Sequence, residues 1–158
     1  MGRRAALVRW RVAYYSPELG VSPNSAFRAP WIEYTAHMAG GIVFLRTAQF
    51  ETVRTFYMDR IGMAVWLDQP DISILRHGNL LVGFHRQSTP DLDALLTFFY
   101  DSRAEVDAMY AKLKDIATTE PRENPKYRIY NFIGVDPEGR TVEFQHFLHP
   151  IPRIYDAG

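Results

Sequence analysis

Histidines, carboxylates and a small set of aromatic and cationic residues are the side chains of this sequence that could carry chemistry. Cysteine is absent, so a metal ion could be held only by histidine, aspartate or glutamate. The histidines are His37, His77, His85, His146 and His149, and no H-x-x-x-H pair occurs among them. Neither a G-x-S-x-G nucleophile motif nor a G-x-x-x-x-G-K phosphate loop is present. Thiolate, serine-hydrolase and phosphate-loop chemistry are therefore disfavoured.

Aromatic and cationic residues could together form one wall of a small-molecule site. Trp66 and Arg76 lie in the first half of the chain, and Tyr127, Arg128 and Tyr130 lie in the second. Aromatic rings stack on planar ligands and guanidinium groups pair with carboxylates, so such a wall suits a planar or anionic ligand. In a strand, Tyr127 would face away from Arg128 and Tyr130, so only one subset can point into a site. Packing between sheet and helix is the alternative role of each aromatic.

The composition excludes several classes of partner. At 158 residues the chain has the size of one domain, and Lys plus Arg and Asp plus Glu number 18 each. There is therefore no basic excess to attract nucleic acid or anionic lipid. No run of 18 apolar residues occurs, and arginines interrupt the apolar N-terminal stretch, so neither a membrane span nor a secretion signal is predicted. The lack of cysteine fits a reducing compartment, and we expect a cytoplasmic protein.

The elements that must position these side chains begin near Gly41. A short apolar run predicts a strand over residues 42–45, and apolar residues at helical spacing then continue to Ile61 and stop at Gly62, which favours a helix end. Three further strands are predicted over residues 64–67, 72–75 and 80–85, the last two joined by a tight turn at residues 76–79. The predicted order is β-α-β-β-β.

The same order is predicted again in the second half. Residues 95–100 form a strand candidate, and Ser102 with Glu105 forms a capping box before a helix with an apolar face from Val106 to Ile116. A loop is predicted over residues 120–125, followed by strands over 127–135 and 141–147 that a turn at 136–139 connects. The strand between helix and loop is only weakly indicated. A repeated unit of this kind must pair with another copy to cover its sheet.

Two segments carry a resemblance to a known family. Residues 56–63, FYMDRIGM, resemble the "FY.d.LGm" end of the first helix in the vicinal oxygen chelate superfamily of glyoxalases, bleomycin-resistance proteins and extradiol dioxygenases. Residues 136–144, DPEGRTVEF, resemble the "DPeGn.vEf" last hairpin of the same superfamily. The two motifs occur in the family's order around the repeated plan. The resemblance covers about residues 40–149.

The resemblance implies an α+β fold of two βαβββ modules, whose curved mixed sheets form a cup with a small-molecule site inside. Family members with a metal take its ligands from four inward-facing strand positions, two in each module. Counted from the motifs, these positions are Ile42, Gly83, Leu95 and Glu143. Shifts of one residue bring in Val43, Val82, Phe84, Ala94 or Leu96. Only Glu143 can bind a metal, so we expect no cofactor, with a divalent metal left only to an unusual site.

Glu143 and His85 are the candidate catalytic residues. Alternation along the predicted strand places His85 on the same face as Gly83, so it could join Glu143 in a rearranged site. A solvent-facing histidine near the strand end is the alternative. His146 is separated from Glu143 by an odd number of residues and is expected on the other face.

The environment of Glu143 has two interpretations. If it faces an apolar cup lined by Ile42, Leu95 and Phe99, desolvation would make it a proton acceptor. If it pairs with Arg128 on a neighbouring strand, its role would be structural. The candidate ligand-binding residues are Ile42, Trp66, Gly83, Leu95, Phe99, Arg128 and Tyr130.

The domain organisation follows from these patterns. Residues 1–39 form an N-terminal extension with a net charge of +3, in which alternation over residues 8–14 predicts an edge strand followed by a loop. Residues 40–149 form the two-module domain, with module one at 40–88 and module two at 93–149, and residues 150–158 form a tail. Either Met1 or Met38 could be the natural start of the compact part.

Three functions are compatible with the sequence. The first is a metal-independent protein that binds a small apolar or aromatic molecule in the cup, because three ligand positions are apolar or glycine. The second is a lyase, isomerase or dioxygenase that uses a rearranged His85/Glu143 site, or Glu143 as a metal-free base. The third is a regulatory or assembly role with a vestigial cup. Since modules of this family pair within or between chains, we also expect a homodimer.

Overall fold

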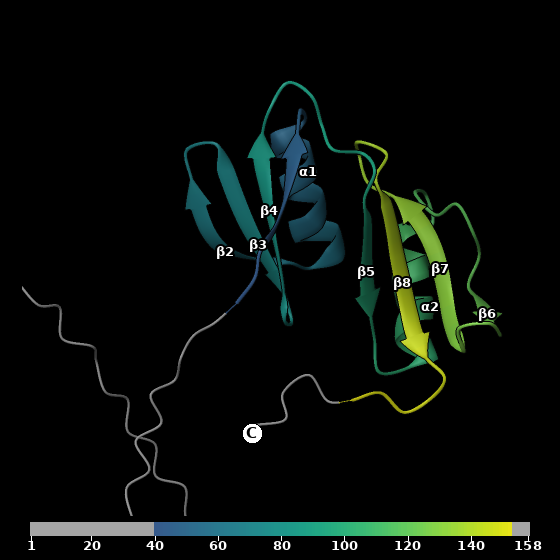
Figure 1. Ribbon diagram of the computed structural model, residues 1–158. Coiled ribbons are helices and arrows are strands. Elements are labelled where there is room, and N and C mark those ends of the chain that lie inside the picture. The colour runs from purple at the N-terminus through teal and green to yellow at the C-terminus, as the bar shows by residue number, and fades with distance from the viewer. Residues whose placement is uncertain (1–39, 153–158) are drawn as a thin grey trace, which may run out of the picture. The chain divides into compact units, whose positions relative to one another are not determined.

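A computed structural model describes residues 40–152 of the chain (Figure 1). The first half contains β1 (Val43–Thr47), α1 (Phe50–Thr55), the π-helical segment η1 (Phe56–Ile61), β2 (Ala64–Gln69), β3 (Ile72–His77) and β4 (Leu80–Arg86). The second half contains β5 (Leu95–Phe99), α2 (Arg103–Leu113), β6 (Arg122–Asn124), β7 (Ile129–Val135) and β8 (Thr141–Phe147). Both halves therefore have the predicted β-α-β-β-β order.

The N-terminal extension predicted over residues 1–39, with its edge strand at residues 8–14, lies outside the described residues. Residues 153–158 of the predicted tail also lie outside them. Within residues 40–152, no helical segment is long and apolar enough to cross a lipid bilayer.

Each half forms a four-stranded mixed sheet, as the resemblance implies. Sheet A has the order β1-β4-β3-β2 and sheet B has the order β5-β8-β7-β6. The pairs β1–β4 in sheet A and β5–β8 in sheet B are parallel. All other neighbouring strands are antiparallel. The predicted α+β fold is confirmed, with two curled sheets that do not close into barrels.

One face of each sheet packs against the helix of its own half. In sheet A, Phe84 stacks on Tyr57 of η1, with ring centroids 4.7 Å apart. In sheet B, Phe132 packs edge-on against Tyr110 of α2 at 5.3 Å. We call the opposite face of each sheet its open face. Because successive residues of a strand alternate, Gly83 and Ile133 belong to open faces, and Glu143 shares its face with its partner Ile133.

The helix ends follow from local sequence. Gly62 has a φ of 91°, a left-handed conformation that costs glycine little, and it ends η1 where the sequence predicts the helix to stop. At the start of α2, the Ser102 side chain accepts a hydrogen bond from the backbone N–H of Glu105, as the capping box predicts. The last turns of the first helix are π-helical, which the apolar spacing alone does not indicate.

Sheet B departs from the sequence prediction at two places. Residues 122–124 of the predicted loop instead form β6, which pairs with β7. The sequence does not predict this strand because its residues, Arg-Glu-Asn, include no apolar residue and therefore no alternation. An exposed edge strand needs no buried apolar face. Strand β7 begins at Ile129 rather than Tyr127, because residues 125–128 form a turn in which Arg128 has a φ of 52°.

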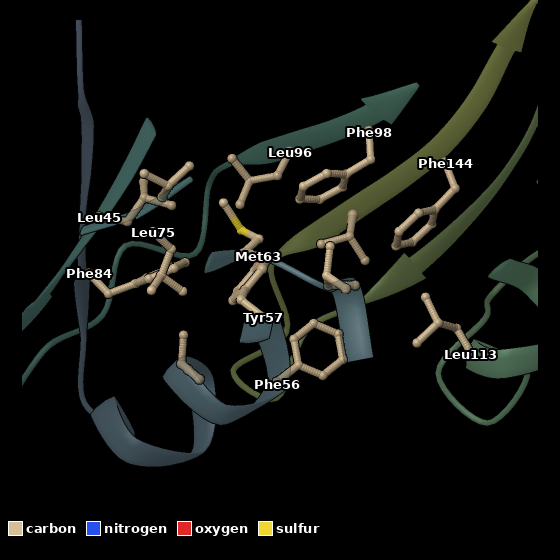
Figure 2. Close-up of a cluster of buried hydrophobic side chains, with 14 of the residues drawn as sticks. Leu45, Phe56, Tyr57, Met63, Leu75, Phe84, Leu96, Phe98, Leu113 and Phe144 are labelled. Atoms are coloured by element: carbon tan, nitrogen blue, oxygen red, sulfur yellow. The ribbon is translucent and has the colours of Figure 1, made fainter. Parts of the chain in front are cut away.

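One hydrophobic core contains side chains from both halves (Figure 2). Tyr57 and Met63 lie between side chains of sheet A and side chains of sheet B in this core. The labelled residues of the two sheets are Leu45, Leu75 and Phe84 in sheet A, and Leu96, Phe98 and Phe144 in sheet B. Burial of each large apolar side chain contributes about 1.5–3 kcal/mol, so the halves stabilise one another.

A buried ionic network also joins the two halves. Arg140, at the end of the turn between β7 and β8, has a fully buried side chain that pairs with Asp136 at 2.8 Å and with Glu138. The same guanidinium donates to the carbonyl oxygens of Arg46 and Asp91, both at 2.7 Å. These contacts join the end of β1, the connection between the halves and the β7–β8 turn.

Glu138 extends this network to the start of α1. Its carboxylate accepts hydrogen bonds from Thr47 Oγ1 at 2.6 Å and from the backbone N–H groups of Ala48 and Gln49, both at 2.7 Å. Burial opposes the charged form, but the hydrogen bonds from Thr47, Gln49 and Arg140 outweigh it and hold the pKa of Glu138 below its ordinary value. A residue of the second half therefore binds the backbone N–H groups of the N-cap residue of α1, Gln49, and of the residue before it.

His77 lies at the contact between the halves and predicts an acid-sensitive stability. Its ring meets Phe98 edge-on at 5.1 Å, and burial lowers its pKa. The folded state therefore favours the neutral ring, so its contribution is complete above about pH 6.5 and declines as the pH falls below that value. We expect His77→Gln to reduce the loss of melting temperature between pH 7.5 and 5.5. Asn79→Ala, in the adjoining turn and without a titrating group, should leave that loss unchanged. If His77→Gln loses as much melting temperature as the unchanged protein, the prediction is wrong.

Candidate functional site

Glu143 is held on the open face of sheet B by two neutral donors. Thr97 Oγ1 donates to Glu143 Oε2 at 2.8 Å, and Asn131 Nδ2 donates to Oε1 at 2.6 Å. The three residues come from β5, β8 and β7, whose pairing places Thr97 and Ile133 beside Glu143. Both carboxylate oxygens are therefore oriented by the sheet itself, which fixes the side chain without a countercharge.

Thr97 and Asn131 are site residues that the sequence analysis misses. Neither belongs to a motif, and a threonine and an asparagine in strands have no functional signature by themselves. Their role follows only from the register of β5 and β7 against β8. The spacing from Leu95 to Thr97 and Phe99 would indicate a shared face once that register is known.

Leu95 and Phe99 flank Thr97 on the same open face, as their spacing predicts. Leu95 is 58% exposed and Phe99 is 37% exposed, which is high for apolar side chains in strands. Contact of this apolar surface with a ligand is more favourable than its contact with water. Such a surface with one oriented carboxylate is therefore typical of a binding site for an apolar ligand.

The open face of sheet A is also apolar near its centre. Phe44 pairs with Gly83, and a Cβ added at Gly83 would overlap the ring of Phe44, so this ring lies over the glycine. Ile74 is the partner of Gly83 on the other side and is buried. Ile42 precedes β1 and is half-buried. Glycine at position 83 thus leaves space that a phenylalanine ring occupies.

His85 lies on the open face of sheet A, where alternation from Gly83 predicts it. Its Nε2 lies 3.0 Å from Nε2 of Gln87. Among the hydrogen bonds of the described residues, none joins His85 to Glu143. His146 lies on the helix-covered face of sheet B, opposite to Glu143, and its Nδ1 contacts the carbonyl oxygen of Tyr100 at 3.0 Å. The structure therefore does not gather the imidazoles around the carboxylate.

The residues present do not fit the family's metal site. Among residues 40–152, no group of three or more His, Cys, Asp or Glu side chains could hold a metal ion. The four positions implied by the resemblance contribute two aliphatic side chains, one glycine and one carboxylate, and both oxygens of that carboxylate already accept hydrogen bonds. Divalent ions need several oxygen or nitrogen ligands, which this set does not supply.

Two predicted ligand-binding residues lie elsewhere. Tyr130 donates its hydroxyl to Asp107 of α2 at 2.8 Å, so it lies on the helix-covered face rather than beside Glu143. Arg128 lies in the turn before β7 and contacts the carbonyl oxygen of Leu148 at 3.5 Å, so the ion pair with Glu143, one of the two interpretations of that carboxylate, is not formed. The observed turn removes Arg128 from the predicted strand, whereas the face of Tyr130 is set by its pairing with His146 of β8.

Trp66 lies at a β-bulge in the edge strand β2. The pairing of β2 with β3 shifts between Val65 and Leu67, and Trp66 is the extra residue. Its side chain is 48% exposed. An exposed tryptophan at a bulge is available for stacking but is not part of an enclosed cavity in the described chain.

A hollow that includes Thr97 and Phe99, from the open face of sheet B, is small. It has a volume of about 180 Å³ and lies between the β3–β4 turn and β5. Its lining residues are His77, Gly78, Asn79, Leu80, Thr97, Phe98 and Phe99. Enclosed small-molecule sites usually measure about 300–1,000 Å³, so this hollow alone is too small for one.

Comparison with solved structures finds proteins of one fold. A glyoxalase/bleomycin resistance protein/dioxygenase family enzyme from Burkholderia phytofirmans PsJN superposes with a TM-score of 0.62 at 20% identity, over 70% of this chain and 100% of that chain. Lactoylglutathione lyase from Agrobacterium tumefaciens gives a TM-score of 0.57 at 21% identity, over 69% and 93% of the two chains. An integron cassette protein from the Halifax Harbour sewage outfall metagenome gives 0.61 at 16% identity, over 70% and 99%.

No protein-family model matches the sequence, and no curated protein matches it either. The likeness to the solved structures is therefore one of fold.

Proposed function

We propose that this chain, which has the fold of glyoxalase, bleomycin-resistance and dioxygenase proteins, binds a small apolar or aromatic molecule on its open sheet faces without a metal. The observation that carries the proposal is the environment of Glu143. Its two oxygens accept hydrogen bonds from Thr97 and Asn131, and exposed Leu95 and Phe99 flank it. Such a surface favours an apolar ligand that an oriented carboxylate can contact.

The ligand positions implied by the resemblance support the same proposal. A metal on this fold would need donors at Ile42, Gly83 and Leu95, where the chain has none. Aliphatic side chains and a phenylalanine ring over Gly83 instead increase the apolar area available to a ligand.

Metal analysis and a binding screen test the proposal together. We expect untagged full-length protein to retain substoichiometric metal after incubation with Zn²⁺, Mn²⁺ or Fe²⁺, and to bind members of a naphthalene-based probe set in calorimetry. Leu95→Asp should weaken probe binding by about tenfold or more, because a charged side chain would replace the apolar surface that the bound probe covers. Leu92→Asp, at a similarly exposed leucine outside the sheets, is the matched control. One tightly held metal per chain that Glu143→Ala removes would overturn the proposal.

We also propose that the functional unit is a cytoplasmic homodimer. The exposed apolar residues on or next to the sheet edges, including Val43 at 52% and Leu95 at 58%, are the kind of surface that association covers. The hollow of about 180 Å³ is too small by itself, so a second copy could complete an enclosed site. We expect sedimentation equilibrium to give twice the 18.3 kDa chain mass. A monomer at all accessible concentrations would contradict this prediction.

An enzymatic role is the second candidate. The orientation of Glu143 by Thr97 and Asn131 favours the version in which this carboxylate acts as a metal-free base, since a base must be held in one geometry. No contact joins His85 to Glu143 in the described residues, so the rearranged two-residue site has less support. A regulatory or assembly role with a vestigial cup depends on residues 1–39.

A further inference from the structure

The arginines of the described chain fall into two groups. Of the nine arginines within residues 40–152, six form an ion pair with an aspartate or glutamate: Arg46, Arg54, Arg60, Arg86, Arg103 and Arg140. No carboxylate of the described residues lies within ion-pair distance of the other three, which are Arg76, Arg122 and Arg128. Pairing is therefore usual in this domain, and the exceptions point to a charge that something else could neutralise.

Arg76 is the exception that lies on the open face of sheet A. It pairs with Leu81 of β4 and with Ala64 of β2, and Leu81 shares its face with Gly83. The side chain is exposed. The neighbouring edge strand β2 carries Trp66, two residues after Ala64, the register partner of Arg76.

The described residues that share the open face of sheet A with Arg76 are mostly apolar and include no acid. The register assigns Phe44, Arg46, Leu67, Gln69, Ile72, Ile74, Arg76, Leu81, Gly83 and His85 to this open face. The only other arginine of this set, Arg46, is neutralised by Asp91. The face therefore combines one free guanidinium with aliphatic and aromatic side chains, which is complementary to an aromatic anion.

The other two unpaired arginines are less suited to this role. Arg122 pairs with Asn131, so it lies on the open face of sheet B, which also carries the Glu143 carboxylate. Arg128 is directed to a backbone carbonyl oxygen, that of Leu148. Within residues 40–152, Arg76 is therefore the only arginine on the open face of sheet A without a carboxylate partner.

We propose that the ligand of this protein is a planar aromatic carboxylate, whose carboxylate is bound by Arg76 while its ring contacts the apolar part of the open face of sheet A. This inference rests on the proposed binding function and adds the ligand's charge. The planar guanidinium can donate two parallel N–H···O hydrogen bonds to a carboxylate, which a neutral amide of the same shape cannot accept in that form.

A matched pair of probes separates the charge from the ring. We expect calorimetry on the full-length protein to show that 2-naphthoate binds about tenfold more tightly than 2-naphthamide. Arg76→Gln should remove this preference, so that the two probes bind within about twofold of one another, while folding is retained because the side chain is exposed. Arg103→Gln, which breaks an exposed ion pair on α2, should keep the preference.

The outcomes distinguish this inference from the function on which it rests. Equal binding of both probes to the unchanged protein, or an undiminished preference in Arg76→Gln, overturns the inference and leaves the binding function intact. If neither probe binds at any concentration tested, both fail. The expected result is a preference for naphthoate that depends on Arg76 and not on Arg103.

Discussion

Replacing Arg140 with methionine is expected to lower the free energy of unfolding by about 3–5 kcal/mol, because it leaves buried carboxylates without their partner. Arg140 is fully buried and pairs with Asp136 and Glu138, whose side chains are also buried. It further satisfies the carbonyl oxygens of Arg46 and Asp91. Urea unfolding of the purified variant, followed by circular dichroism, measures the loss.

A surface pair supplies the control for this prediction. Arg103 and Glu123 form an ion pair with side chains 49% and 53% exposed, so Arg103→Met should cost no more than about 1 kcal/mol. If Arg140→Met were as mild as Arg103→Met, the buried network would not hold the halves together. A variant too unstable to purify would still be informative by pulse proteolysis beside Arg103→Met.

The neutral hydroxyl of Tyr57 contributes to the same network. Burial and the adjoining Asp136 carboxylate raise the pKa of Tyr57, so the hydroxyl stays protonated and donates to Asp136 at 3.1 Å. Asp136 also accepts from the backbone N–H groups of Glu138 and Arg140, both at 2.9 Å. The DPEGR turn therefore connects the two halves as well as joining β7 to β8.

Gly83→Val is expected to destabilise the protein by about 1–3 kcal/mol, because an added side chain would overlap the ring of Phe44. Valine is otherwise favourable in a strand, and glycine there is unfavourable by about 0.5–1 kcal/mol. In a Phe44→Ala background the overlap is gone, so the same substitution should be neutral or stabilising. A double-mutant cycle in urea measures the coupling, expected to exceed about 1 kcal/mol.

Gly41→Val is the matched control for that cycle, since nothing lies within 4 Å of a Cβ added there. It should change the free energy of unfolding by less than about 0.5 kcal/mol in either background. Were Gly83→Val to cost the same with and without the Phe44 ring, the ring would not lie over the glycine. The Phe44 ring would then no longer count as part of the apolar surface at position 83.

The two substitutions address different parts of the proposal. Arg140 tests what holds the halves in one core, and Gly83 tests what occupies a strand position where the resemblance implies a metal ligand. A phenylalanine ring over a glycine cannot donate to a metal, but it adds apolar surface to the open face. The Gly83 result therefore bears directly on a binding function that needs no metal.

Much of the fold follows from the sequence because its signals are local. The spacing of apolar residues up to Ile61, the glycine at position 62 and the capping box of Ser102 with Glu105 predict helices that the structure contains. Alternation predicts most strands, and the two motifs give the order of the repeat. The exceptions are β6, which has no apolar residue to alternate, and the turn at Arg128, where a non-glycine residue adopts a left-handed conformation.

The sequence by itself determined the repeated β-α-β-β-β plan, the side chains at the four positions implied by the resemblance and the faces of His85 and His146, because each depends on residue type and strand period. Only the tertiary structure decided which donors hold Glu143, why Tyr130 faces α2 and how Arg140 joins the halves. Those facts depend on the register between strands distant in sequence and on which arginines form ion pairs with carboxylates. No local sequence pattern indicates the register or the ion pairs.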